Sequence, residues 1–200
     1  PRRVFTYLPK LLDKIYGQTL SCNDVEILVL FDNKKRSIGA KRNDLIRMAQ
    51  GEYLIFVDDD DMVSDDYVES ILTATEEGSD VIVYDWICKI TELNGSTREV
   101  SATSGIEFPP GQGWSEDKTK AWCRPANWTA AFKSEIAKRH LFDDVSAAED
   151  YIWAAKIHPD LKTQTRINKV LYYYDADMAK SLLEHPPAPA NIHKKFIKGE

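Results

Sequence analysis

Four consecutive carboxylates, at residues 58–61, are the most distinctive chemical feature of the sequence. They directly follow an apolar run at 53–57, which predicts a buried β-strand. Open α/β sheets bind ligands at the carboxyl ends of their strands, and carboxylate oxygens suit Mg²⁺ or Mn²⁺ bridged to phosphates. We therefore interpret residues 58–61, the acidic turn, as a site where a divalent cation holds a diphosphate. The alternative is a solvated turn ahead of a helix, whose positive end also favours carboxylates.

A second pair of carboxylates, Glu149 and Asp150, stands near the start of a helix predicted at 146–157. Ser146 and Glu149 have the Ser-x-x-Glu spacing of a capping box, which would explain Glu149 without any chemistry. That explanation leaves Asp150 without a role. A carboxylate on the first turn of a helix can face a cleft and take a proton, so Asp150 is a candidate general base.

Two cations, Lys41 and Arg42, follow Gly39 at the start of a helix predicted at 37–50. The free backbone N–H groups of a helix start, together with two cations, suit a phosphate group or a nucleotide. The alternative is an ordinary amphipathic helix that happens to begin with a glycine and two basic residues.

Tryptophans are concentrated in the second half of the sequence. Their rings can stack on sugars, although packing in a core is the commoner role of a tryptophan. The four tryptophans of this half are Trp114, Trp122, Trp128 and Trp153.

Alternating helices and apolar strands are expected to position these groups. Ser64 is the predicted cap of one helix, and Gly78 its predicted end. The alternation predicts a parallel, doubly wound α/β sheet, because apolar strands without a polar face are covered on both sides. In this first part the predicted helices are 4–17, 37–50 and 64–78, and the predicted strands are 25–31, 53–57 and 80–86.

The rest of the sequence follows a different pattern. Residues 87–103 predict a hairpin that turns at Asn94 and Gly95. The segment 104–120 is rich in Gly, Pro and polar residues, which is typical of a long functional loop. Beyond it, the predicted strands are 128–132 and 170–174, and the predicted helices are 134–140 and 146–157. Residues 182–200 are predicted to be a Pro-rich linker with a basic end.

Composition limits the classes of function. With 43% hydrophobic residues, the chain can bury a sizeable core. Its 26 Lys and Arg against 32 Asp and Glu give a net charge of −6, so it lacks the basic field of a non-specific nucleic-acid binder. The longest apolar run, 25–31, is far shorter than the roughly 20 residues that span a bilayer, and no signal peptide is evident. Three widely spaced cysteines favour a reducing compartment, so we expect a cytoplasmic location.

Taken together, these segments resemble the family-2 glycosyltransferases with the GT-A fold, over residues 1–181. The resemblance is carried by the segments 24–32, 37–43 and 51–61, and by Glu149 and Asp150 about ninety residues later. It implies a Rossmann-like α/β sandwich with a mostly parallel central sheet and a small antiparallel region on the acceptor side. Residues 1–86 would then form the nucleotide-sugar-binding half, and residues 87–181 the acceptor-binding half. The family's first strand would precede Pro1, so we expect it to be missing from this sequence.

The same resemblance implies an inverting transfer from a nucleoside-diphosphate sugar to an acceptor hydroxyl, with Mn²⁺ or Mg²⁺ as cofactor. Asp150 matches the family's catalytic base, with Glu149 beside it. By position, the donor-binding residues would be Asp32, Lys41, Arg42, Asp58 and Asp59, the metal ligands Asp60, Asp58 and Asp61, and the acceptor-binding residues Trp122 and Trp128.

Two other functions are compatible with parts of the sequence. A strand followed by Asp58 and Asp60 also suits a HAD-type phosphatase, in which one aspartate is a nucleophile. That family has Thr or Val at the position of Met62, which disfavours the assignment. The second alternative is a nucleotide-sugar-binding module without turnover, which the presence of both carboxylate groups disfavours.

Overall fold

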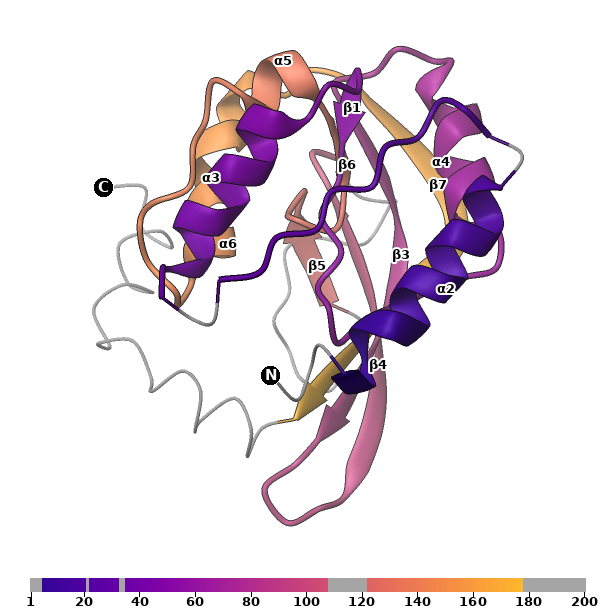
Figure 1. Ribbon diagram of the computed structural model, residues 1–200, viewed down its shortest axis with the longest axis vertical. Helices are drawn as coiled ribbons and strands as arrows, with labels where there is room; N and C mark the ends of the chain where they lie inside the picture. The colour runs from indigo at the N-terminus through magenta and orange to yellow at the C-terminus, as the bar shows by residue number, and fades with distance from the viewer. Residues whose placement is uncertain (1–4, 21, 33–34, 108–121, 178–200) are drawn as a thin grey trace.

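The computed structural model describes residues 5–20, 22–32, 35–107 and 122–177, which fold as an α/β structure around one mixed sheet (Figure 1). The helices are α2 (Leu8–Thr19), α3 (Ile38–Met48), α4 (Tyr67–Thr75), α5 (Ser134–Ala137), α6 (Glu149–Ile157) and the 3₁₀ helix η1 (His158–Asp160). The strands are β1 (Tyr53–Leu54), β2 (Met62–Val63), β3 (Val81–Thr91), β4 (Thr97–Gly105), β5 (Trp122–Pro125), β6 (Ala131–Lys133) and β7 (Gln164–Asp177).

Strand β3 is the centre of the sheet. The order is β1-β6-β3-β4-β5, and β7 pairs with β3 and also with β2. The pairs β3–β7 and β4–β5 are parallel, whereas β1–β6, β3–β6, β3–β4 and β2–β7 are antiparallel. The predicted α/β class is confirmed, but the described sheet is mixed where the sequence predicted a mostly parallel one. The difference comes from the antiparallel pairs β1–β6, β3–β6 and β2–β7, which were not predicted. The β3–β4 hairpin was predicted, and its turn at Gly95 has a φ of +81° that glycine tolerates.

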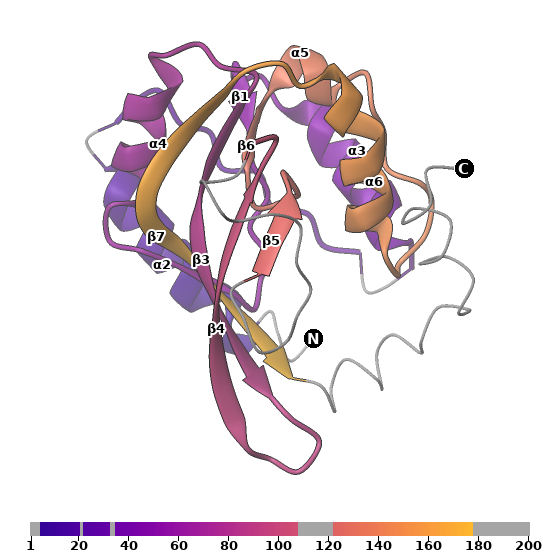
Figure 2. The same cartoon turned by 180° about the vertical axis from the view of Figure 1, so that it is seen from behind.

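Helices cover both faces of the sheet. In Figure 1, α3, α5 and α6 lie on one side and α2 and α4 on the other, and Figure 2 shows the same arrangement from behind. Each layer has its own core: one is built around Tyr84 and Trp86 with α4, and the other around Phe132 and Trp153 with α3 and α6. The acidic turn follows β1 and precedes β2.

The segment 25–31 does not form the predicted buried strand. It is extended, but no strand of the described residues forms a ladder with it. Val29 is 41% exposed and Phe31 60% exposed, although both are apolar. Glu26 anchors the segment instead, since its Oε1 accepts hydrogen bonds from the backbone N–H groups of Gln50 and Gly51. An apolar run shows a tendency to be buried, but only a neighbouring strand makes it part of a sheet.

Two predicted helix starts are also wrong. Asp66, not Ser64, is the N-cap of α4, and the Ser64 hydroxyl donates to the Asp66 carboxylate. Helix α6 begins at Glu149, and its N-cap is Ala148 rather than Ser146. The capping-box explanation of Glu149 is therefore excluded. The predicted start of α3 is confirmed, because the Ser37 hydroxyl accepts from Ala40 N–H.

The strands differ in length from the predictions because the length of each strand depends on how far it pairs with its neighbours. Strand β1 keeps only two residues of the predicted 53–57, whereas β3 and β7 pair over eleven positions and extend far beyond the predicted 80–86 and 170–174. Neither β2 nor β5 is predicted.

The predicted linker and basic end at 182–200 lie outside the described residues. No helix in the described part of the chain is long and apolar enough to cross a membrane, and all three cysteines are free.

Candidate active site

Arg42 is the centre of the candidate active site. It lies on the buried face of α3, and its side chain is only 7% exposed. Its Nη2 donates to Asp58 Oδ1 at 2.9 Å, and its Nη1 lies 3.5 Å from Glu149 Oε1. The rings of Phe56, Trp128 and Phe142 lie 5.4–5.9 Å from the guanidinium carbon. One cation thus joins α3, the acidic turn and the start of α6.

Charges around Arg42 determine the ionisation of this cluster. Burial lowers the pKa of Arg42, but the negative charges of Asp58, Glu149 and Asp150 outweigh burial and raise it. Burial also raises the pKa of Glu149 to about 7. The positive charge of Arg42 lowers this pKa, and the negative charge of Asp150 raises it. Arg42 Nη1 is buried and has no hydrogen-bond partner among the described residues. The guanidinium therefore stays charged, and its Nη1 makes an ion pair with Glu149 without a hydrogen bond.

The backbone just before Glu149 is strained. Ala148 has a φ of +58°, in the left-handed region that favours glycine. Such a conformation costs about 1–3 kcal/mol and persists only where surrounding contacts determine it. Here it directs the first turn of α6, with Glu149 and Asp150, toward Arg42.

The four carboxylates of the acidic turn point to different surroundings. Asp61 N–H donates to Asp58 O at 3.1 Å, which closes the turn. Asp58 pairs with Arg42, whereas Asp61 is 3% exposed and accepts from Tyr172 Oη at 2.6 Å and from Asp175 N–H at 3.1 Å. Burial, with the charge of Asp58, raises the pKa of Asp61 to about 8. Asp59 is half-buried, and Asp60 lines a cavity of about 310 Å³.

Tyr172 holds the acidic turn in place. Its hydroxyl, fully buried in β7, donates to Asp61 and accepts from the backbone N–H of Asp58 at 3.2 Å. Burial is the main cause that raises the pKa of Tyr174, two residues further along β7. The negative charges of Asp61, Asp58 and Asp150 raise this pKa further. The sequence predicted a strand here and no site residue. Nothing in the pattern of three tyrosines indicates that one of them would bind a turn 111 positions away.

The residues of the acidic turn do not form a complete metal cage. Within the part of the chain that the structure describes, no three His, Cys, Asp or Glu side chains are grouped so that they could hold a metal ion. Magnesium and manganese sites that bind nucleotides need only one or two protein carboxylates, because phosphates and water complete the coordination. Asp60 and Asp58 fit that smaller requirement, whereas both oxygens of Asp61 are already hydrogen-bonded.

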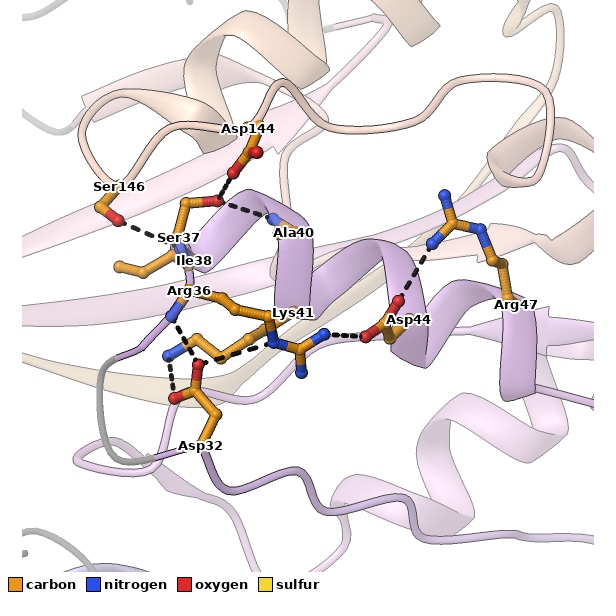
Figure 3. Close-up of polar contacts among 10 residues, drawn as sticks. All are labelled: Asp32, Arg36, Ser37, Ile38, Ala40, Lys41, Asp44, Arg47, Asp144 and Ser146. Atoms are coloured by element: carbon orange, nitrogen blue, oxygen red, sulfur yellow. Dashed lines mark hydrogen bonds and ion pairs between the residues drawn. The ribbon is translucent and has the colours of Figure 1, made fainter.

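Asp32 and Lys41 meet beside the start of α3 (Figure 3). Lys41 Nζ lies 3.4 Å from Asp32 Oδ1, and Arg36 N–H donates to Asp32 Oδ2 at 2.9 Å. The Asp32 side chain is 9% exposed, and Arg36 also pairs with Asp44. Two of the predicted donor-binding residues therefore contact each other, and both are tied to the helix that carries Arg42.

The loop before α6 is attached to the start of α3. Gly39 N–H donates to Val145 O at 3.0 Å. Ile38 N–H donates to Ser146 Oγ at 3.2 Å (Figure 3). A Cβ on Gly39 would lie 1.9 Å from Asp143 O, so only glycine permits this approach. The predicted phosphate-binding segment is thus also the docking point for the loop that positions Glu149 and Asp150.

Asn43 completes this attachment. Its side-chain amide donates to Phe142 O at 2.9 Å and accepts from Phe142 N–H at 2.7 Å, with both residues buried. In the sequence, Asn43 belongs to the segment 37–43 that carries the family resemblance, and no role was predicted for it. The available signal was an asparagine in a helix interior, where it is neutral to unfavourable unless its side chain has a partner.

The two tryptophans predicted for the acceptor side belong to one aromatic row. Trp128 is 5% exposed and packs edge-to-face on Tyr174, with 6.2 Å between ring centroids. Trp122 packs on Trp86 at 6.3 Å, and Trp86 packs on Tyr174 at 6.2 Å. The indole N–H groups of Trp86, Trp122 and Trp128 are buried and have no acceptor among the described residues. The row therefore connects Trp122 with the side chains around Arg42.

Residues 7–134 match the protein family described as Glycosyl transferase family 2. This segment is more than half of the chain and includes Asp32, Arg42 and the acidic turn. The chain therefore belongs to glycosyl transferase family 2.

Among curated proteins, the chain is 20% identical over 198 residues to "Putative glycosyltransferase EpsH" of Bacillus subtilis (strain 168), covering 84% of this chain and 57% of EpsH. Among solved structures, it is similar to S. aureus TarS 1-349 in complex with UDP-GlcNAc, with a TM-score of 0.58, 16% identity, and coverage of 86% of this chain and 56% of TarS 1-349. A second structure of TarS 1-349 gives a TM-score of 0.56 at 16% identity, over 85% and 57% of the two chains. These structures show the GT-A fold. The chain spans little more than half the length of these relatives.

Proposed function

We propose that this chain forms the donor-binding and catalytic part of a metal-dependent, inverting glycosyltransferase. It would move a sugar from a nucleoside-diphosphate sugar to an acceptor hydroxyl. The observation that carries the proposal is the cluster in which Arg42 joins Asp58 of the acidic turn to Glu149, next to Asp150. Family membership supports transfer of a sugar, and the UDP-GlcNAc complex of TarS supports a uridine-diphosphate sugar as donor.

The proposed donor site includes Asp32, Lys41 and Arg42. Asp32 would recognise the nucleotide base, and the two cations would contact the nucleotide and its phosphates. Glu149 is a positioning residue in this scheme, because it contacts Arg42 and not the reacting atoms. Residues 1–86 would thus supply the donor half, and residues 87–181 the acceptor half, with Trp122 and Trp128 near the acceptor.

In the proposed reaction, Asp150 takes the proton of the acceptor hydroxyl. The acceptor oxygen then attacks the anomeric carbon from the face opposite the diphosphate, and the electron pair of the broken bond leaves with the diphosphate oxygen. One displacement inverts the anomeric configuration. General base catalysis of this kind contributes about 10²–10⁴-fold in rate.

A divalent cation would be held by Asp60 and Asp58, with Asp59 near the donor and Asp61 as a buried support for the turn. Mn²⁺ or Mg²⁺ bound there would neutralise the charge that gathers on the departing diphosphate. The ion pair between Asp58 and Arg42 supports this assignment, because it aligns one carboxylate with the cation proposed to hold the nucleotide.

Substitution of the proposed base tests the function directly. The variant Asp150→Asn should bind UDP as the wild type does but release UDP from UDP-GlcNAc, in the presence of Mn²⁺ and an acceptor mixture, about 10²–10⁴ times more slowly. The control is Asp24→Asn, which changes an exposed aspartate outside the site. Normal turnover by Asp150→Asn would show that Asp150 is not the base.

The same assay separates the proposal from its alternatives. A wild-type chain that binds UDP and Mn²⁺ but never turns over any nucleotide sugar would be a binding module. Release of phosphate from p-nitrophenyl phosphate would indicate a phosphatase, although the family match lends the HAD-type alternative no support.

A further inference from the structure

A cavity of about 310 Å³ adjoins the acidic turn on the side of Asp60 and Asp61. Neither Arg42 nor Asp58 lines it, but Asp60 does, so the cavity adjoins the proposed metal site without including the cluster around Arg42. Its walls come from the start of α2 and from β2, β3, β4 and β7, and a smaller cavity of about 110 Å³ adjoins it toward Asp177. The volume is at the lower end of small-ligand pockets, which hold about 300–1,000 Å³.

Aromatic rings make up much of the wall. Tyr7, Tyr173 and Tyr174 line the cavity together with the apolar side chains of Met62 and Ile87. Tyr173 is 43% exposed although it lies in a central strand, so its ring faces open space. A tyrosine offers an apolar ring with a polar tip, which suits the mixed apolar and hydroxyl-bearing faces of a sugar.

The charged groups of the wall are mainly carboxylates. Lys10 and Lys89 face the cavity together with Asp60, Glu99 and Asp175, and Asp177 lines the adjoining cavity. Asp61 also lines the cavity, but burial raises its pKa to about 8, so it adds little negative charge at neutral pH. Ionised carboxylates accept strong hydrogen bonds from hydroxyl groups. They repel phosphate and carboxylate groups. A divalent cation at Asp60 would add two positive charges, but the donor diphosphate that it binds brings as many negative ones, so the surroundings remain acidic.

Tyr174 links this cavity to the cluster around Arg42. Its side chain lines the cavity, and its ring packs on Trp128, whose ring lies 5.9 Å from the guanidinium carbon of Arg42 beside the start of α6. In the part of the chain that the structure describes, its ring contacts Trp86 and Trp128, while its hydroxyl makes no hydrogen bond. A ligand in the cavity could therefore bind this hydroxyl at the end of the aromatic row that leads to the cluster around Arg42.

We propose that this cavity is the acceptor site and that the acceptor is an uncharged carbohydrate, not one bearing phosphate or carboxylate groups. The inference rests on the proposed function and extends it by naming the chemical class of the acceptor. The tyrosines would pack against the sugar ring, and Glu99 and Asp175 would accept hydrogen bonds from its hydroxyls.

The test is ligand-observed NMR by saturation transfer on the 200-residue chain, with and without UDP and Mn²⁺. The probes are the methyl glycosides of glucose and N-acetylglucosamine, each compared with a charged partner, glucuronic acid or N-acetylglucosamine 6-phosphate. The neutral glycosides should receive saturation, and the charged partners at least several-fold less. Tyr173→Ala should abolish the signal of the neutral glycosides, whereas the control Tyr16→Ala, an exposed tyrosine of α2 outside the cavity, should retain it.

A charge reversal gives an independent readout. Glu99→Lys should shift the preference toward the charged glycosides, because it replaces a repelling group with an attracting one. Equal or stronger binding of the charged glycosides by the wild type, retained binding in Tyr173→Ala, or no binding of any neutral glycoside would each overturn the proposal. UDP binding is measured separately by calorimetry, so a chain that binds UDP but no neutral glycoside refutes only this inference. Failure to bind UDP would refute the proposed function itself.

Discussion

At the scale of single residues, the site depends on Arg42, which is shared between two carboxylates from distant segments. Removing one partner of a buried ion pair leaves the other charge uncompensated, which typically costs about 3–5 kcal/mol. Arg42 lies at 2.9 Å from Asp58 and 3.5 Å from Glu149, so its charge is needed for the fold as well as for the donor. Loss of activity on substituting Arg42 would therefore be ambiguous, and Asp60 is the better probe.

Asp60 faces the cavity and lies outside that ion-pair cluster, so Asp60→Ala should leave the fold intact. We expect UDP binding in the presence of Mn²⁺ to weaken about 10- to 100-fold or more, since even the loss of groups that only support metal ligands has effects of that size. Isothermal titration calorimetry with Mn²⁺ and with EDTA measures the difference. Asp13→Ala, an exposed aspartate of α2, is the matched control. Unchanged affinity in Asp60→Ala with the metal present would contradict the metal role.

At the scale of elements, the contact between α3 and the loop before α6 determines where Asp150 lies. The contact depends on close backbone approach at Gly39 and on the paired hydrogen bonds of Asn43 with Phe142. Ala148, whose φ is +58°, lies between this loop and the first residue of α6. Helix α3 is therefore both a source of donor contacts and the support of the catalytic helix.

Gly39→Ala tests this support. An added Cβ would meet Asp143 O at 1.9 Å, so the loop must move, and we expect a loss of about 1–3 kcal/mol in the free energy of unfolding together with slower transfer. Gly17→Ala in α2 is the control, since a Cβ there meets nothing within 4 Å and alanine favours a helix by about 1 kcal/mol. Urea unfolding of both variants gives the comparison. A Gly39→Ala protein as stable as Gly17→Ala would show that the loop does not need this approach.

At the scale of the whole molecule, the donor should bind to residues from separate segments that only the folded chain brings together. Arg42 on α3, the acidic turn after β1 and the start of α6 come together only in the folded chain, with α3 and α6 on the same side of the sheet. A ligand that binds only the native state stabilises it by about 2.7 kcal/mol at 100 times its dissociation constant. For a domain of this size that corresponds to a rise in Tm on the order of 5–10 °C.

A thermal-shift comparison of UDP, GDP and ADP follows from this. We expect UDP with Mn²⁺ to raise the Tm most, and EDTA to remove most of the increase. Mn²⁺ alone serves as the reference, because it separates binding of the cation from binding of the nucleotide. If no nucleoside diphosphate shifts the Tm in the presence of Mn²⁺, the proposed donor site does not exist in this chain.

The sequence by itself determined the local features of this protein. The Ser37 cap of α3, the Asn94-Gly95 hairpin, the acidic turn after an apolar strand and the family resemblance could all be predicted, because each depends on residues close together in the chain or on a motif with fixed spacing. Glu149 and Asp150 were correctly expected on the first turn of a helix, although its predicted cap was wrong.

Only the tertiary structure decided which of these features meet. The partners of Arg42, the support of Asp61 by Tyr172 and the pairing of Asn43 with Phe142 join positions that are 16 to 111 residues apart. The run at 25–31 remained outside the sheet for the same reason, since its apolar character gives a tendency to be buried but does not provide a hydrogen-bonding neighbour. Whether a segment is buried and pairs in a sheet depends on which distant segments of the chain pack beside it. The periodicity of residues within the segment carries no information about those neighbours.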